Sequence, residues 1–189
     1  IGAVLDEVGL PEYMTARQIG RMMAGIFARW QPEVYRDYLR RLALPEDKPF
    51  RDFSRGMKMK LGLAAALSHQ PKLLLLDEAT SGLDPVVRDE ILTIFADFTR
   101  DEEHAVLLSS HIVSDLEKIC DYIAFLHKGR LLLCEEKDRL TEEYGILRGG
   151  TDGIAPAAVC GRHTTPYGTE YLVRRSAVPA GMTLGQVNI

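Results

Sequence analysis

The sequence predicts an α/β fold in which a parallel sheet has helices on both faces. Two short apolar runs, residues 73–76 and 105–108, have the length and composition of strands that are buried inside a parallel sheet. Stretches with the 3.6-residue spacing of amphipathic helices precede, separate and follow these runs. Strands that alternate with helices in this way are typical of parallel sheets. The 189 residues, 46% of them hydrophobic, are enough to bury a domain core.

The first part of the chain is expected to contain a short strand and two helices. Residues 1–5 are apolar and suggest the strand. Thr15 and Gln18 form a T-x-x-Q capping box, which marks the start of a helix. Apolar residues recur with helical spacing from there to Trp30, and Pro32 then suits the first position of a second amphipathic helix.

Two longer helices are predicted on either side of the central apolar run. Ser54 is a good N-cap for a helix that reaches about Ser68. After the run, Asp84 and Pro85 have the residue types of an N-cap and a first helical position, and this helix is expected to reach about Glu102.

The rest of the chain is predicted to hold shorter elements. We expect a helix over residues 112–119, with Val113 facing inward, and a short helix over residues 137–144. Between them, two apolar stretches flank Lys128-Gly129 and predict a β-hairpin. From residue 146 the sequence becomes rich in glycine, and residues 169–174 are the strongest strand candidate there.

The sequence argues against nucleic-acid binding and against a membrane-spanning segment. A net charge of −4 and a pI near 5.8 give no basic field for nucleic acid. No apolar run approaches the ~18 residues that a membrane span needs. The three cysteines are odd in number and form no C-x-x-C pair, which favours reduced thiols in a cytosolic protein.

Two acidic residues, Asp77 and Glu78, directly follow the central apolar run. Parallel strands end at the sheet edge where open α/β folds place their ligands. Two carboxylates at that edge cost desolvation unless a cation or a proton transfer compensates. The pair therefore predicts a magnesium site at Asp77 and an attacking water at Glu78, although a strand end followed by a simple turn would also explain it.

The start of the helix at Ser54 is a candidate phosphate site. The first backbone N–H groups of a helix have no partner inside the helix, and Gly56 has no side chain to block a close approach. His111, which two serines separate from the second apolar run, could donate a hydrogen bond to a phosphate oxygen or to water. Simple helix capping and an ordinary loop histidine are the alternative interpretations.

These motifs together resemble those of ATP-binding-cassette (ABC) ATPases. The run LLLLDEATSGLDP, residues 73–85, is similar to the Walker B strand and D-loop of that family, and FSRGM, residues 53–57, is similar to its signature motif. His111 lies where the family has its switch histidine. The chain departs from the usual pattern at Arg55 and Met57, where Gly and Gln are common, and at Asp6, where the Q-loop glutamine is usual.

The resemblance implies a P-loop-NTPase-like fold and assigns roles to nine residues, with ATP and Mg²⁺ as cofactors. The implied catalytic residues are Glu78 and His111. The residues implied to contact ATP bound by the opposing subunit are Ser54, Arg55, Gly56, Met57 and Asp84. Asp77 and Asp6 are implied to hold Mg²⁺ through water.

One motif of the family does not occur in the sequence. There is no G-x-x-x-x-G-K-[ST] phosphate-binding loop, and no glycine is followed by lysine. The expectation is therefore a fragment that lacks an N-terminal half of roughly 80 residues and that is inactive alone.

The resemblance also implies a division into four segments. They are the end of a core strand with the Q-loop region (1–11), a helical subdomain with the signature motif (12–70), the ATPase core (71–145) and a small β-rich extension (146–189).

The predicted function is the ATP-hydrolysing subunit of an ABC transporter of the bacterial exporter type, coupling hydrolysis to export. Its expected partners are a transmembrane permease and a second ATP-binding subunit, with no nucleic acid. Its expected location is cytoplasmic, on the inner face of the membrane. A non-transport ABC ATPase and a truncated, non-catalytic dimerisation or regulatory module are the alternatives.

Overall fold

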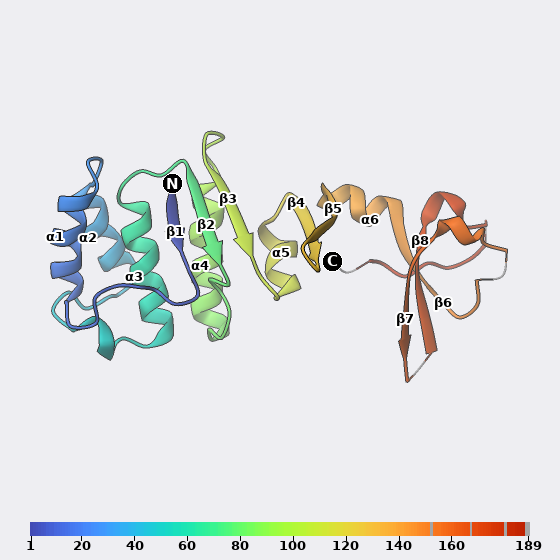
Figure 1. The fold of residues 1–189 in the computed structure, drawn as a ribbon, viewed down its shortest axis with the longest axis horizontal. Helices are drawn as coiled ribbons and strands as arrows, with labels where there is room; N and C mark the ends of the chain where they lie inside the picture. Colours follow the sequence, from blue (N-terminus) through green and yellow to red (C-terminus); the bar gives the residue numbers. More distant parts are fainter. Residues whose placement is uncertain (152, 167, 180, 188–189) are drawn as a thin grey trace. The chain divides into compact units, whose positions relative to one another are not determined.

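The computed structural model describes residues 1–151, 153–166, 168–179 and 181–187. The chain forms two compact units, Ile1–Asp115 and Leu116–Ile189 (Figure 1). The first unit contains both apolar runs and all nine predicted site residues.

A three-stranded parallel sheet organises the first unit. Its strands are β1 (Gly2–Val4), β2 (Leu73–Asp77) and β3 (Ala105–Ser109), and β2 lies between the other two (Figure 1). In this register Asp77 is opposite Ser109, so the carboxyl ends of β2 and β3 meet at one edge. The predicted parallel α/β arrangement is confirmed.

Burial of the sheet differs from the sequence-based expectation. Leu74 and Leu76 are buried, whereas the alternate residues Leu73 and Leu75 are only half-buried. The run 105–108 was expected to be fully buried, but it lies at the sheet edge and Leu107 is 65% exposed. The reason is that β2 is the one strand paired with β3 among the described residues, a relation that hydrophobicity alone does not reveal.

Local sequence signals place the helix starts correctly. The helices of this unit are α1 (Ala16–Ile26), α2 (Pro32–Arg41), α3 (Arg55–Leu67) and α4 (Pro85–Phe98), with a 3₁₀ turn, η1 (Phe50–Asp52), before α3. The capping box is present, because Thr15 Oγ1 accepts from the Gln18 amide and Gln18 Oε1 accepts from the Thr15 amide.

Two helix ends and one helix face were predicted incorrectly. The helix α1 ends at Ile26, so Trp30 lies outside it, and α4 ends at Phe98 rather than near Glu102. In α5 (Val113–Ile119), which crosses the division between the units, Val113 is exposed rather than inward. Tertiary packing decides where these helices end and which residues face inward, and the periodic pattern of apolar residues carries no information about that packing.

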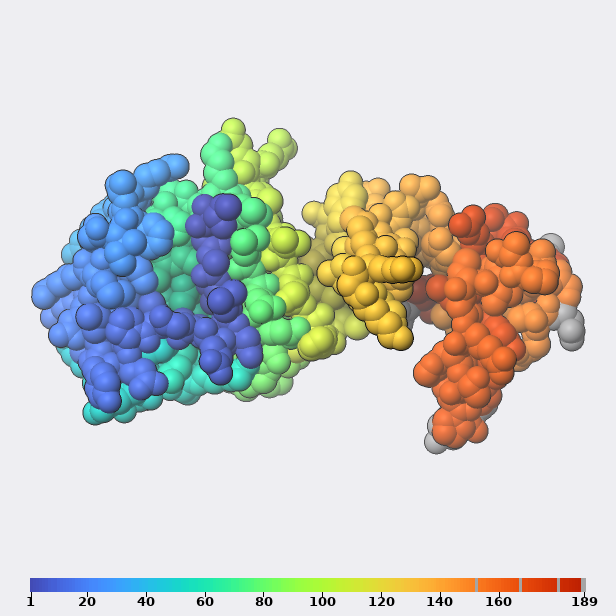
Figure 2. All heavy atoms as spheres, in the orientation of Figure 1, coloured from blue at the N-terminus to red at the C-terminus, as the bar shows by residue number. Residues whose placement is uncertain are grey.

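The second unit begins with the predicted hairpin. Strands β4 (Tyr122–His127) and β5 (Arg130–Glu136) pair antiparallel, and Lys128 and Gly129 both have positive φ, as a tight hairpin turn requires. Several exposed apolar side chains lie on these strands, which are gold at the surface in Figure 2.

A helix, α6 (Lys137–Glu143), leads into a three-stranded antiparallel sheet. Its strands β6 (Tyr144–Arg148), β7 (Val159–Thr165) and β8 (Gly168–Arg174) have the order β6-β8-β7, and two 3₁₀ turns, η2 (Pro156–Ala158) and η3 (Arg175–Ala177), adjoin them. The strand predicted at residues 169–174 is confirmed as β8, but β7 was not predicted. The hydrophobic core of this three-stranded sheet contains Leu147, Ile154, Ala158 and Val173.

Among the helices that the structure describes, none has the length and apolar character needed to cross a membrane.

Candidate functional site

The adjacent ends of β2 and β3 bring a serine against the predicted acidic pair. Ser109 Oγ donates to Asp77 Oδ1 at 2.5 Å. The Glu78 amide donates to the Ser109 carbonyl oxygen at 3.1 Å and approaches Ser109 Oγ at 3.3 Å. Sequence analysis gave Ser109 no role. Aligning the two predicted parallel strands at their carboxyl ends would have identified it.

Glu78 has a backbone conformation that side chains rarely adopt. Its φ is 51°, in the left-handed region, directly after the last residue of β2. Its side chain is 19% exposed, and Oε2 is buried without a hydrogen-bond partner among the described residues. Glu78 therefore holds a nearly desolvated carboxylate oxygen that can accept a hydrogen bond.

The structure places His111 next to Glu78. His111 Nε2 lies 3.2 Å from Glu78 Oε1, although the two residues come from the ends of different strands. The imidazole is 92% exposed, so it borders the solvent while the carboxylate is mostly covered. The carboxylate can accept a proton from a water molecule, and the imidazole can donate a hydrogen bond to that water or to a phosphate oxygen.

The turn from Glu78 to Asp84 connects this pair to α4. The Ser81 amide donates to the Glu78 carbonyl oxygen at 3.0 Å, and Gly82 has a φ of 66°. Asp84 Oδ1 accepts from the Val86 and Val87 amides, each at 3.1 Å, which confirms its predicted N-cap position.

The predicted signature residues lie at the start of α3. Ser54 is the N-cap, and its Oγ accepts from the Met57 amide at 3.3 Å. Gly56 has a packing role that sequence analysis missed, since an added Cβ would come within 3.1 Å of Val87 Cγ1 on α4. The absence of a side chain therefore lets α3 approach α4 closely.

Arg55 and Asp6 contact each other. The Arg55 guanidinium forms an ion pair with Asp6 in the segment after β1, and Arg55 Nε donates to the Ser81 carbonyl oxygen at 3.1 Å. Both side chains of the ion pair are about half exposed. Arg55 thus joins the start of α3 to two other segments, a connection that sequence analysis did not anticipate.

The carboxylates of Asp77 and Glu78 fit a magnesium ion only together with oxygen ligands from other groups. Among the residues that the structure describes, there is no group of three or more His, Cys, Asp or Glu side chains that could hold a metal ion alone. Asp77 presents a carboxylate at the exposed sheet edge, and Glu78 Oε2 has an unused acceptor site. These residues suit a magnesium–nucleotide group, because Mg²⁺ in such groups keeps several waters and binds phosphate oxygens.

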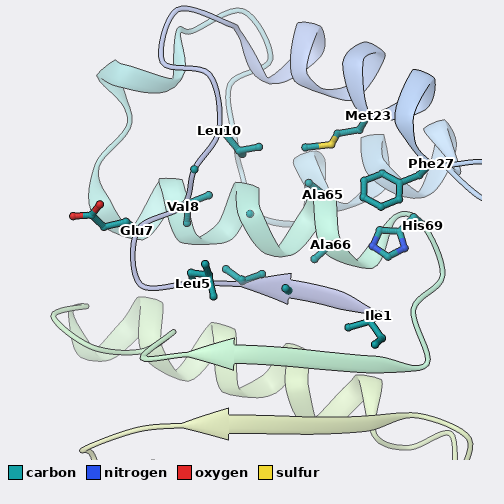
Figure 3. A pocket seen from close by; sticks show the side chains of 14 residues that line it. Ile1, Leu5, Glu7, Val8, Leu10, Met23, Phe27, Ala65, Ala66 and His69 are labelled. Carbon is teal, nitrogen blue, oxygen red and sulfur yellow. The ribbon is translucent and has the colours of Figure 1, made fainter.

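A separate apolar pocket lies beside β1, away from the acidic pair. It has a volume of about 390 Å³, and side chains from α1, α3 and the segment after β1 line it, including Val8, Met23, Phe27 and His69 (Figure 3). None of the nine predicted site residues is among its lining residues.

Comparison with protein families gives one match to part of the chain. Residues 29–114 match a family described as "AAA domain, putative AbiEii toxin, Type IV TA system". This range contains α2, α3, β2, α4 and β3, and it includes Ser54, Asp77, Glu78 and His111.

Curated relatives match with higher coverage of this chain. The ABC transporter ATP-binding protein YtrB of Bacillus subtilis (strain 168) is 32% identical over 130 residues, which are 69% of this chain and 44% of YtrB. The lantibiotic transport ATP-binding protein SrtF of Streptococcus pyogenes is 42% identical over 93 residues, which are 49% of this chain and 40% of SrtF. The chain therefore spans less than half the length of these relatives.

A solved structure shares the fold. The ATP-binding cassette MJ0796, in a dimeric post-hydrolysis state bound to ADP and Pi, matches with a TM-score of 0.63 and 17% sequence identity. The match covers 71% of this chain and 62% of the MJ0796 chain.

Proposed function

Because this chain belongs to the family of ABC transporter ATP-binding proteins, we propose that it contributes the water-activating residues to ATP hydrolysis in a transporter. The observation that carries the proposal is the pairing of Glu78 with His111 at the carboxyl edge of the sheet. A mostly covered carboxylate with a free acceptor oxygen is suited to polarise an attacking water. ATP, when bound, supplies the phosphoanhydride whose hydrolysis drives the transporter.

The other residues take supporting roles in this proposal. His111 donates a hydrogen bond to a γ-phosphate oxygen, and Asp77 holds Mg²⁺ through water. Asp6 was the second expected magnesium contact, but its carboxylate already has Arg55 as a charged partner, so we assign magnesium to Asp77. The residues proposed to face ATP of the opposing subunit are Ser54, Arg55, Gly56, Met57 and Asp84.

The proposal includes partners that the chain does not contain. The dimeric state of MJ0796 supports a second ATP-binding subunit, and the transport names of YtrB and SrtF support a membrane permease. We propose that the protein works at the inner face of the membrane and that the permease exports its substrate. We also propose that the 189-residue chain alone does not hydrolyse ATP, because its sequence has no G-x-x-x-x-G-K-[ST] loop to hold the phosphates.

Replacing Glu78 with glutamine tests the catalytic role. Phosphate release is measured with the ATPase assembly purified from the cells that make this chain. The Glu78→Gln variant should hydrolyse ATP at least about 100-fold more slowly, because glutamine cannot accept a proton from water. Glu103→Gln is the matched control, since Glu103 lies at the surface in an ion pair with Lys72, and it should hydrolyse ATP normally.

Unchanged hydrolysis by the Glu78→Gln assembly would instead favour the alternative of a non-catalytic module. In that case the chain would only offer the start of α3 to a partner that has its own water-activating residue.

A further inference from the structure

We propose that Arg55 is a positioning residue for Glu78. It ties the turn that carries Glu78 to Asp6 and to the start of α3. This inference rests on the function proposed above, and it concerns residues that contact each other within the first unit.

A continuous series of contacts links Asp6 to the catalytic pair. Asp6 forms an ion pair with the Arg55 guanidinium, and Arg55 Nε donates to the Ser81 carbonyl oxygen at 3.1 Å. The Ser81 amide donates to the Glu78 carbonyl oxygen at 3.0 Å, and Glu78 Oε1 lies 3.2 Å from His111 Nε2. A shift of Arg55 would therefore move the peptide that holds Glu78 in place.

The geometry requires an arginine. The Nε and Nη2 atoms of one guanidinium reach Ser81 and Asp6 at the same time, whereas the single ammonium of a lysine has no such planar fork. The neighbouring Gly82 lies beside this group, where an added Cβ would be in ordinary van der Waals contact with Arg55 Nε at 3.4 Å. The positive φ of Gly82 also directs the turn around the guanidinium.

Electrostatics explain why Asp6 is the partner. Arg55 is the first residue of α3, and the first turn of this helix contains no acidic residue. A cation at a helix N-terminus is unfavourable, since that end already carries partial positive charge. The Asp6 carboxylate, which lies outside the helix, offsets the charge of Arg55 and the partial positive charge of the helix N-terminus. Ion pairs that are half exposed contribute little to stability, so the main consequence of this pair is positional.

The first experiment measures structure without ATP. Amide hydrogen exchange is recorded on the 189-residue chain and on the Arg55→Gln variant. Exchange should become about tenfold faster at the Ser81 amide, because its turn loses the Arg55 anchor. The control is Arg17→Gln, since Arg17 is also an ion-paired side chain of similar exposure (50%, against 51% for Arg55). Equal exchange at Ser81 in all three proteins would overturn the proposal.

The second experiment measures the hydrolysis constants of the native assembly. Arg55→Gln should lower kcat about tenfold or more while changing KM less, because the catalytic carboxylate is displaced. Arg55→Lys should not restore kcat, and Arg17→Gln should leave it normal. A raised KM with an unchanged kcat would overturn the positioning role and leave Arg55 only the contact with ATP of the opposing subunit that is proposed above.

A double variant separates the role of Asp6 from magnesium binding. If Asp6 acts through Arg55, the single variant Asp6→Asn should lower kcat. The same change made in the Arg55→Gln background should lower kcat no further. An additional loss in that background, with a higher magnesium requirement, would mean that Asp6 acts on the metal. If Glu78→Gln also leaves hydrolysis unchanged, the proposed function is wrong, while the exchange experiment still decides whether Arg55 holds the turn.

Discussion

The left-handed backbone of Glu78 turns the chain sharply at the end of β2. A residue with a side chain at positive φ costs about 1–3 kcal/mol, and surrounding contacts must hold it there. Ser109 supplies these contacts on one side, since both its carbonyl oxygen and its hydroxyl lie near the Glu78 amide. The same hydroxyl donates to Asp77, so one serine orients two adjacent carboxylic residues.

The Ser109 hydroxyl should therefore contribute to stability. Replacing Ser109 with alanine is expected to lower the free energy of unfolding by about 1 kcal/mol, because the Asp77 carboxylate loses a hydrogen bond. Ser109→Thr keeps a hydroxyl and should lose less. The measurement is urea unfolding of the chain. The Ser110→Ala variant controls for removing a hydroxyl from the next residue, whose Oγ accepts from the Ile112 amide instead.

Part of the candidate site could be predicted from the sequence. Asp77, Glu78 and His111 follow predicted strands, and parallel strands bring their ends to one edge, so their closeness was foreseeable. The contact between Arg55 and Asp6 was not foreseeable. These two residues are 49 positions apart, and their contact depends on how the segment after β1 passes the start of α3.

At the scale of elements, α1 and α2 pack through a glycine and a tyrosine. A Cβ added to Gly20 would lie only 2.6 Å from Tyr35 Cε1. The ring cannot easily move aside, because Tyr35 is buried and its hydroxyl donates to the Ala16 carbonyl oxygen at 2.8 Å. Burial also raises the pKa of this hydroxyl, so it stays protonated as a donor at neutral pH.

Two glycines on α1 should respond oppositely to alanine. Gly20→Ala is expected to destabilise the chain by about 1–3 kcal/mol, because the added methyl group collides with the Tyr35 ring. Gly25→Ala should be neutral or stabilising by up to about 1 kcal/mol, since an added Cβ meets nothing within 4 Å and alanine favours a helix. Thermal unfolding of both variants gives the comparison. Similar losses in both would mean that Tyr35 does not restrict Gly20.

Helix starts were easier to predict than helix ends or strand neighbours. A capping side chain acts on amides two or three residues away, so Thr15, Ser54 and Asp84 could be identified from local sequence. The ends of α1 and α4 have no comparable residue and depend on packing. The strand β7 contains glycine, arginine and histidine, and its pairing with β8 alone makes it a strand.

At the scale of the whole first unit, His69 connects stability to pH. It is buried after α3, and its ring stacks on Phe27 with centroids 4.2 Å apart. Burial is the main cause that lowers the pKa of His69, and the charge of Arg29 adds to it, against an opposing backbone hydrogen bond. The folded unit therefore favours the neutral imidazole.

This shift predicts a loss of stability in mild acid. The pKa of His69 is lower in the folded state than in the unfolded state, so the unfolded chain binds more protons there. The contribution of His69 is complete above its unfolded pKa of about 6.5 and declines as the pH falls below it. Most carboxylates titrate below this window, so urea unfolding at pH 7.5 and pH 5.5 reports mainly on histidines. Because the chain has five histidines, a variant at position 69 is needed to assign the effect.

The matched variant is His69→Phe, which keeps an aromatic ring against Phe27 but cannot be protonated. Its free energy of unfolding should fall less between the two pH values than that of the natural chain. His127→Gln, in the exposed hairpin of the other unit, should retain the natural pH dependence of the first unit. If His69→Phe lost as much stability in acid as the natural chain, another group would carry the pH dependence, because a phenylalanine has no proton to gain.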